Sequence, residues 1–149
     1  TASTNDYPII YHVEEKEIVI DIGNDDRFLI AAKQWRSLSM TTKEKIDKEQ
    51  RVLCLHGWLD NANSFDRIAP LLCERYALHI IAYDDAGCGQ SQHKKHSAYT
   101  VVESVVDMYK VMNTLGWKSQ TILMSHSRGA VCSLLFTSAF PGLVRKCIM

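Results

Sequence analysis

Residues 120–140 read QTILMSHSRGAVCSLLFTSAF, and this stretch decides the fold. The apolar run Gln120–Met124 predicts a strand, and Arg128–Phe140 predicts a helix that Pro141 ends. The pentapeptide SHSRG, residues 125–129, joins the two without a linker. A strand that turns directly into a helix indicates an α/β architecture.

The chain outside this stretch repeats the same alternation. We predict strands at Val52–Leu55, Ala77–Tyr83 and Lys146–Met149, a helix at Phe65–Arg75 that Ser64 caps, and a helix at Val102–Leu115 that Gly116 ends. The strands are continuously apolar, which indicates burial on both faces. The order β-α-β-α-β-α-β therefore predicts a mostly parallel sheet with helices on both faces.

The N-terminal part of the sequence predicts a hairpin. Apolar side chains alternate over Glu17–Ile22, turn residues follow, and Phe28–Trp35 is typical of a second strand. Ser37–Gln50 is polar and charged, so we predict a solvated loop inserted at this point, with a short helix as the alternative. Because the sequence shows no repeat and no linker, we expect residues 1–149 to form one domain.

The composition is that of an ordinary globular protein. Seventeen basic residues balance 17 acidic ones, which gives no reason to expect nucleic acid as a partner. No apolar run approaches the roughly 18 residues of a membrane span, and the polar opening residues do not form a signal peptide. The five cysteines form no C-x-x-C pair, so we expect free, mostly buried thiols in a reducing compartment.

The SHSRG turn has the features of a nucleophile elbow. Ser127 lies at its centre, and the tight turn demands small residues two positions before and after it, where Ser125 and Gly129 stand. We expect the Ser127 hydroxyl to be exposed above the strand ends, beside the positive end of the next helix. The alternative is a plain turn whose serine only caps the helix. The strand and the helix on either side favour the elbow.

Two more motifs follow predicted strands. His56-Gly57-Trp58 comes directly after Val52–Leu55, and Gly57 lets the backbone turn inward without a Cβ clash. The sequence DDAGCGQS, residues 84–91, follows the next strand. Its G-x-G pattern also occurs in dinucleotide-binding loops, but neither a third glycine nor a helix follows directly, so we predict a structural role.

Together, the three motifs resemble those of the α/β-hydrolase-fold superfamily, in the same order and each at its expected strand end. Residues 56–72, HGWLDNANSFDRIAPLL, are similar to the serine hydrolase-like protein branch. Ser125 replaces the usual glycine, and Asp85-Ala86 stands where Leu-Pro is common. The resemblance extends from Tyr7 to Met149 and implies the N-terminal part of an α/β-hydrolase domain, without its C-terminal strands.

The resemblance also implies a chemistry. Ser127 is the expected nucleophile, and the backbone N–H groups of Trp58 and Arg128 are the expected oxyanion hole. His56 is then a structural histidine that braces its loop. A serine at this position, rather than an aspartate, implies acyl transfer on an ester, thioester or amide through an acyl-serine. We expect a carboxylesterase-like serine hydrolase with a small-molecule acyl substrate and without a metal or other cofactor, in the cytoplasm or alternatively the peroxisome.

The catalytic acid and base have no candidates after Ser127. The superfamily places an Asp or Glu and then a His after the nucleophile, yet residues 128–149 contain none of these. His126 is adjacent, but strand alternation predicts that its ring points to the opposite face. We therefore expect an N-terminal portion that is inactive in isolation. The alternative is a non-catalytic homologue that acts as a binding or interaction module; the sequence indicates no oligomeric state.

Overall fold

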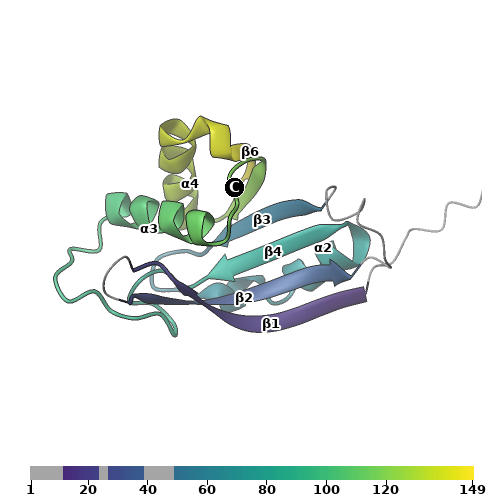
Figure 1. Cartoon of the computed structure of the whole chain (residues 1–149), viewed down its shortest axis with the longest axis horizontal. Helices are drawn as coiled ribbons and strands as arrows, with labels where there is room; N and C mark the ends of the chain where they lie inside the picture. Colours follow the sequence, from purple (N-terminus) through teal and green to yellow (C-terminus); the bar gives the residue numbers. More distant parts are fainter. Residues whose placement is uncertain (1–11, 24–26, 39–48) are drawn as a thin grey trace, which may run out of the picture.

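The structure, a computed structural model, describes residues 12–23, 27–38 and 49–149. Six strands form one sheet in this part of the chain, in the order β1-β2-β4-β3-β5-β6 (Figure 1). The strands are β1 (His12–Asp21), β2 (Leu29–Leu38), β3 (Gln50–Leu55), β4 (Leu78–Tyr83), β5 (Thr121–Ser125) and β6 (Val144–Ile148). The helices are α2 (Ile68–Arg75), α3 (Val101–Thr114) and α4 (Arg128–Ala139), with short 3-10 turns η1 (Ala62–Phe65) and η2 (Pro141–Leu143).

The strand pairing confirms the predicted architecture. β1 and β2 form an antiparallel hairpin, and β2 also runs antiparallel to β4. β3 pairs in parallel with β4 and β5, and β5 pairs in parallel with β6. Parallel neighbours need crossover connections, which α2, α3 and α4 supply. Because these strands run in the same direction, the loops after β3, β4 and β5 meet at one edge of the sheet.

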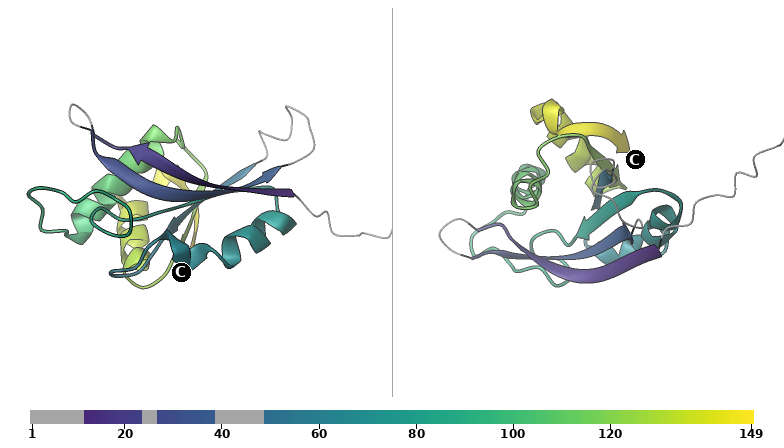
Figure 2. Two further views of the ribbon diagram at one scale, coloured as in Figure 1. Left: turned by 90° about the horizontal axis from the view of Figure 1, so that it is seen from below. Right: turned by 45° about the vertical axis from the view of Figure 1, so that its right-hand side comes forward.

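The helices cover both faces of the sheet and create two cores (Figures 1 and 2). Successive residues of β3 show the division, because adjacent strand residues point to opposite faces. Leu53 belongs to the core under α3 and α4, together with Met108 and Phe136. Cys54 belongs to the core under α2, together with Cys73. The strands that carry the site loops are therefore supported from both sides.

The N-terminal hairpin is longer than the sequence predicts. β2 extends to Leu38, so Ser37 and Leu38 are strand residues and not part of a solvated loop. The buried Ser37 hydroxyl donates to the Tyr76 carbonyl at 2.6 Å and accepts the Leu78 N–H at 3.1 Å, which satisfies a polar group inside the fold. Gln50 already begins β3. The rest of the predicted loop, with its alternative helix, falls on residues 39–48, outside the described residues.

The start of the first helix also differs from the prediction. Asn61, not Ser64, is the capping residue: its side-chain oxygen accepts the Asn63 N–H at 2.9 Å and begins the η1 turn. The Ser64 hydroxyl donates to the Asp60 carboxylate instead. α2 then begins without a side-chain cap, and Pro70 lies in its first turn, where a missing N–H costs little.

The second predicted helix, α3, is confirmed within one residue at each end, and its N-terminal cap was not predicted. The Thr100 hydroxyl accepts the Glu103 N–H at 3.3 Å, and the Glu103 carboxylate accepts the Thr100 N–H at 2.7 Å, which is a capping box. Gly116 follows the helix with φ +69°, a conformation that glycine adopts easily. None of the helices in the described part of the chain has the length and apolar character needed to cross a bilayer.

The five cysteines are free thiols, as the sequence predicts. Cys54, Cys73 and Cys132 are buried, while Cys88 and Cys147 are half-buried. Burial raises the pKa of the Cys73 thiol to about 11. Because the thiolate is the reactive form, Cys73 is chemically inert at neutral pH.

Candidate active site

Ser127 lies at the tip of the turn between β5 and α4. Its backbone has φ 54° and ψ −124°, and a positive φ is uncommon outside glycine. Such a conformation is typical of the strained turn that presents a nucleophile. The residue is exposed, and its side chain makes no capping hydrogen bond to α4. The alternative interpretation, a serine that only caps the helix, is therefore wrong.

The neighbours of Ser127 show why the turn needs small residues. A Cβ atom on Gly129 would lie 2.4 Å from the carbonyl oxygen of Leu55, so α4 approaches the end of β3 too closely for any other residue. Ser125 is buried, and its hydroxyl accepts a hydrogen bond from the Ser133 hydroxyl at 2.9 Å. Ser133, on α4, thus provides a hydrogen-bond partner for the hydroxyl of Ser125, the residue that stands where glycine is usual.

The loop after β3 lies directly against this turn. A Cβ atom on Gly57 would lie 3.5 Å from the Cβ of Ser127, so the two backbones approach each other here. The next residue, Trp58, has an exposed side chain. Among the described residues, no hydrogen bond uses the backbone N–H of Trp58 or of Arg128. Both predicted oxyanion donors are therefore free to bind a ligand.

His56 is a brace within the loop, as the sequence predicts. Its Nε2 accepts the backbone N–H of Asp85 at 2.9 Å, so the proton of the neutral ring lies on Nδ1. Nδ1 then donates to the Gly57 carbonyl oxygen at 2.7 Å. The side chain is buried, and both ring nitrogens are in use. His56 ties the loop after β3 to the loop after β4.

His126 is not a strand residue, as the prediction about its ring assumed. β5 ends at Ser125, so His126 belongs to the turn, where strand alternation does not apply, and its ring lies against Gly57. Its Nε2 lies 3.5 Å from a carboxylate oxygen of Asp60.

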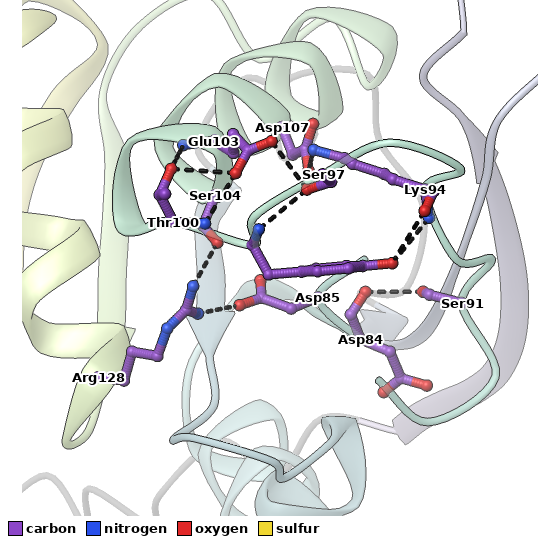
Figure 3. Close-up of polar contacts among 11 residues, drawn as sticks. Asp84, Asp85, Ser91, Lys94, Ser97, Thr100, Glu103, Ser104, Asp107 and Arg128 are labelled. Atoms are coloured by element: carbon purple, nitrogen blue, oxygen red, sulfur yellow. Dashed lines mark hydrogen bonds and ion pairs between the residues drawn. The ribbon is translucent and has the colours of Figure 1, made fainter. Parts of the chain in front are cut away.

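The side chain of Arg128 contacts three other segments at the site. Its Nη1 donates to the Asp85 carboxylate at 2.5 Å, and its Nη2 donates to the Ser104 hydroxyl on α3 at 2.7 Å (Figure 3). Its guanidinium carbon lies 5.3 Å from the centre of the Trp58 ring. These contacts were not predicted, because they join residues that are far apart in the sequence. Asp85, which stands where leucine is common, was the one available signal.

A cavity of about 340 Å³ lies next to these residues. Gly57, Trp58 and Arg128 contribute to its wall, and so does the Lys94–Asp107 ion pair, in which the two groups are 2.5 Å apart. Burial raises the pKa of Asp107, while the Lys94 ammonium lowers it again. The size suits a small organic ligand. Within the described residues, no three His, Cys, Asp or Glu side chains gather closely enough to hold a metal ion.

The loop over residues 84–91 has the structural role that the sequence predicts. The Asp84 carboxylate accepts the N–H of Ala62 at 2.7 Å and of Gln90 at 2.8 Å. A Cβ atom on Gly89 would lie 2.1 Å from this carboxylate, and Gly89 has φ +49°. The next helix begins only at Val101, so the loop lacks the helix start that would bind a pyrophosphate.

Comparison with known proteins agrees with this geometry. The profile of a family described as alpha/beta hydrolase fold matches residues 50–149. A serine hydrolase-like protein of Dictyostelium discoideum is 39% identical over 138 residues, and the human serine hydrolase-like protein is 40% identical over 121 residues. These alignments cover 91% and 80% of this chain but 34% and 54% of the relatives. The chain thus spans a third to a half of their length.

Solved structures show the same fold. A hypothetical protein from Pseudomonas aeruginosa, 32% identical, matches with a TM-score of 0.73 over 88% of this chain and 41% of its own. The 2-hydroxy-6-oxo-6-phenylhexa-2,4-dienoate hydrolase of Rhodococcus, 22% identical, matches with a TM-score of 0.72 over 91% of this chain and 46% of its own. The chain therefore belongs to the α/β-hydrolase fold family.

Proposed function

We propose that the whole protein is a serine hydrolase in which Ser127 attacks the acyl carbonyl of a small-molecule substrate. The observation that carries the proposal is the exposed, strained Ser127 beside two free backbone N–H groups. The serine hydrolase-like names of the relatives in Dictyostelium discoideum and Homo sapiens agree with it.

The proposed chemistry uses these groups in turn. The Ser127 oxygen bonds to the carbonyl carbon, and the electron pair of the carbonyl moves onto its oxygen. The N–H groups of Trp58 and Arg128 stabilise that oxyanion, and the positive end of α4 adds to the effect because the helix begins at Arg128. Collapse expels the alcohol, thiol or amine, and water then hydrolyses the acyl-serine.

The base that removes the Ser127 proton belongs, in this proposal, to residues outside the 149. His56 uses both ring nitrogens in its brace, and His126 faces Asp60. Residues 128–149 contain no histidine. Since general-base catalysis contributes a factor of about 10²–10⁴, we expect the 149-residue chain alone to hydrolyse acyl substrates at least about 100-fold more slowly than the whole protein.

We further propose a carboxylesterase-like specificity. The cavity of about 340 Å³ touches both proposed oxyanion residues, Trp58 and Arg128. Its volume lies at the lower end of the range for small-molecule sites, which favours a compact acyl group.

A non-catalytic binding module is the second candidate. The observation that favours it is that His56 and His126, in the loops that meet at the Ser127 turn, both have other partners and so are not free to activate the hydroxyl. The cavity beside Trp58 would then hold a ligand without converting it.

A fluorophosphonate probe distinguishes the two candidates. We expect the whole protein to be labelled on Ser127 and the Ser127→Ala variant to remain unlabelled, because the probe reacts only with an activated serine. Ser138→Ala, an exposed serine on α4, is the matched control and should be labelled like the wild type. A folded wild-type protein that takes up no probe would contradict the hydrolase and support the binding module.

A further inference from the structure

The Arg128 guanidinium lies, partly buried, among three segments that meet at the proposed oxyanion hole. It donates to Asp85 at 2.5 Å and to Ser104 at 2.7 Å (Figure 3). Its guanidinium carbon lies 5.3 Å from the centre of the Trp58 ring. The Arg128 and Asp85 side chains are 13% and 15% exposed, which shields their ion pair from solvent. Because an unpaired charge costs free energy where solvent is excluded, the two side chains must keep the geometry of the ion pair.

From Asp85, two further hydrogen bonds reach the other oxyanion donor. The Asp85 N–H holds His56 Nε2 at 2.9 Å, and His56 Nδ1–H holds the Gly57 carbonyl oxygen at 2.7 Å. That carbonyl and the Trp58 N–H belong to the same peptide unit. Because a trans peptide is planar, its N–H points away from its C=O. Fixing the Gly57 carbonyl therefore fixes the direction of the Trp58 N–H.

We infer that Arg128 is a positioning residue for the hydrolysis proposed above, through its side chain as well as its backbone. Its backbone N–H is one oxyanion donor. Its side chain holds Asp85, which holds His56 and thereby orients the second donor, Trp58. The two donors are thus coupled across the loops after β3, β4 and β5. The inference rests on the proposed function of Ser127.

The pair Arg36–Glu49 offers a matched control within the same sheet. The Arg36 Nε and Nη2 atoms donate to the two Glu49 carboxylate oxygens at 2.8 and 2.9 Å. This pair is bidentate, whereas Arg128 donates to Asp85 through Nη1 alone, but both pairs are partly buried. Arg36 lies opposite His79, near the start of β4, whereas Asp85 follows the end of β4. The control pair is therefore at the other end of the sheet from Ser127.

The test measures kcat and KM of the whole protein on an activated ester. Asp85→Asn and Arg128→Lys should each lower kcat by about 10- to 100-fold with KM within about threefold, because misaligned donors lose contact with the transition state rather than with the substrate. The double variant should be no slower than the slower single variant, since the two residues act as one unit. Asp85→Glu, which keeps the carboxylate, should regain part of kcat, and Glu49→Gln should leave it unchanged.

Two results separate the inference from the function on which it rests. If the wild type hydrolyses the ester but the Asp85 and Arg128 variants keep kcat, or raise KM alone, the positioning role is wrong and the hydrolase stands. A loss of kcat in Glu49→Gln equal to that in Asp85→Asn would also overturn it, because the effect would then be one of general stability. If the wild type neither hydrolyses the ester nor labels at Ser127, both proposals fall together.

Discussion

The start of α4 and its outer side differ in how they are held. At the start, the elbow region (Ser125–Gly129) is fixed by close backbone contact with Leu55 and by hydrogen bonds to other segments. On the outer side, an edge region exposes large apolar side chains by 45–63%: Val131, Leu134, Leu135, Ile148 and Met149. β6 is also the last strand of the described sheet.

The shape of the site and the burial of the edge region are therefore independent of each other. The groups that shape the Ser127 turn find their partners within the described residues, so the turn does not depend on the edge region for its form. The edge residues bury little of their apolar surface and contribute correspondingly little to stability. Matched variants test this division.

The largest expected effect is that of Phe136→Ala, and its neighbour Leu135→Ala is the matched control. Phe136 is fully buried against the sheet, while Leu135 is 45% exposed. We expect Phe136→Ala to lower the free energy of unfolding by about 3–5 kcal/mol through the cavity that it leaves. Leu135→Ala should lower it by about 0.5 kcal/mol. Urea denaturation measures both, and equal losses would contradict the division.

Gly129→Ala should be the next most severe. The new Cβ would lie 2.4 Å from a backbone oxygen, which cannot move aside as a flexible side chain can. We expect a loss of about 3 kcal/mol in the free energy of unfolding. Gly142→Ala, where a Cβ meets nothing within 4 Å, should change it by less than about 0.5 kcal/mol. If thermal melting finds Gly129→Ala as stable as Gly142→Ala, the close approach of α4 to the end of β3 would be contradicted.

Ser133→Ala should have an intermediate effect. It leaves the buried Ser125 hydroxyl without its partner, which costs about 1–3 kcal/mol. Ser125→Gly combined with Ser133→Ala removes both groups, so the double variant should recover most of that loss. Chemical denaturation of the two variants measures the difference. A double variant that is less stable by the sum of two independent losses would exclude this pairing.

The smallest effect concerns the capping box that holds α3, and with it Ser104, beside Arg128. The hydrogen bond from the Thr100 N–H lowers the pKa of the Glu103 carboxyl below its usual value of 4.5. A lowered pKa means that the stabilisation is complete above pH 4.5 and is lost as the pH falls through the lower value. We expect the stability difference between wild type and Glu103→Gln to shrink below pH 4.5. A stability difference that grows as the pH falls would contradict the lowered pKa of Glu103.

The sequence predicts the fold well because its main signals are local. Apolar runs locate the strands, and apolar spacing with Gly116 locates α3, from neighbouring residues alone. The errors have physical reasons: Ser37 is a polar strand residue whose partners lie about 40 residues away, and His126 belongs to a turn, where strand alternation does not apply.

The candidate site is predictable only in part. Ser127 and Gly129 are recognisable because the elbow is one continuous stretch of chain. The contacts of Arg128 with Asp85 and of Ser133 with Ser125 depend on how strands and helices pack, which no local pattern encodes. Sequence patterns thus locate the nucleophile, while the packing reveals what holds it.

The central claim, that the Ser127 hydroxyl attacks the acyl carbonyl, is tested most directly by trapping the intermediate. The whole protein would be mixed with an activated ester, quenched in acid within the first turnover and digested with trypsin. We predict the added mass of one acyl group on the tryptic peptide 119–128, located by fragmentation to Ser127 and absent from Ser127→Ala. Ester hydrolysis that continues undiminished in Ser127→Ala, without an acyl group on this peptide in the wild type, would contradict the account.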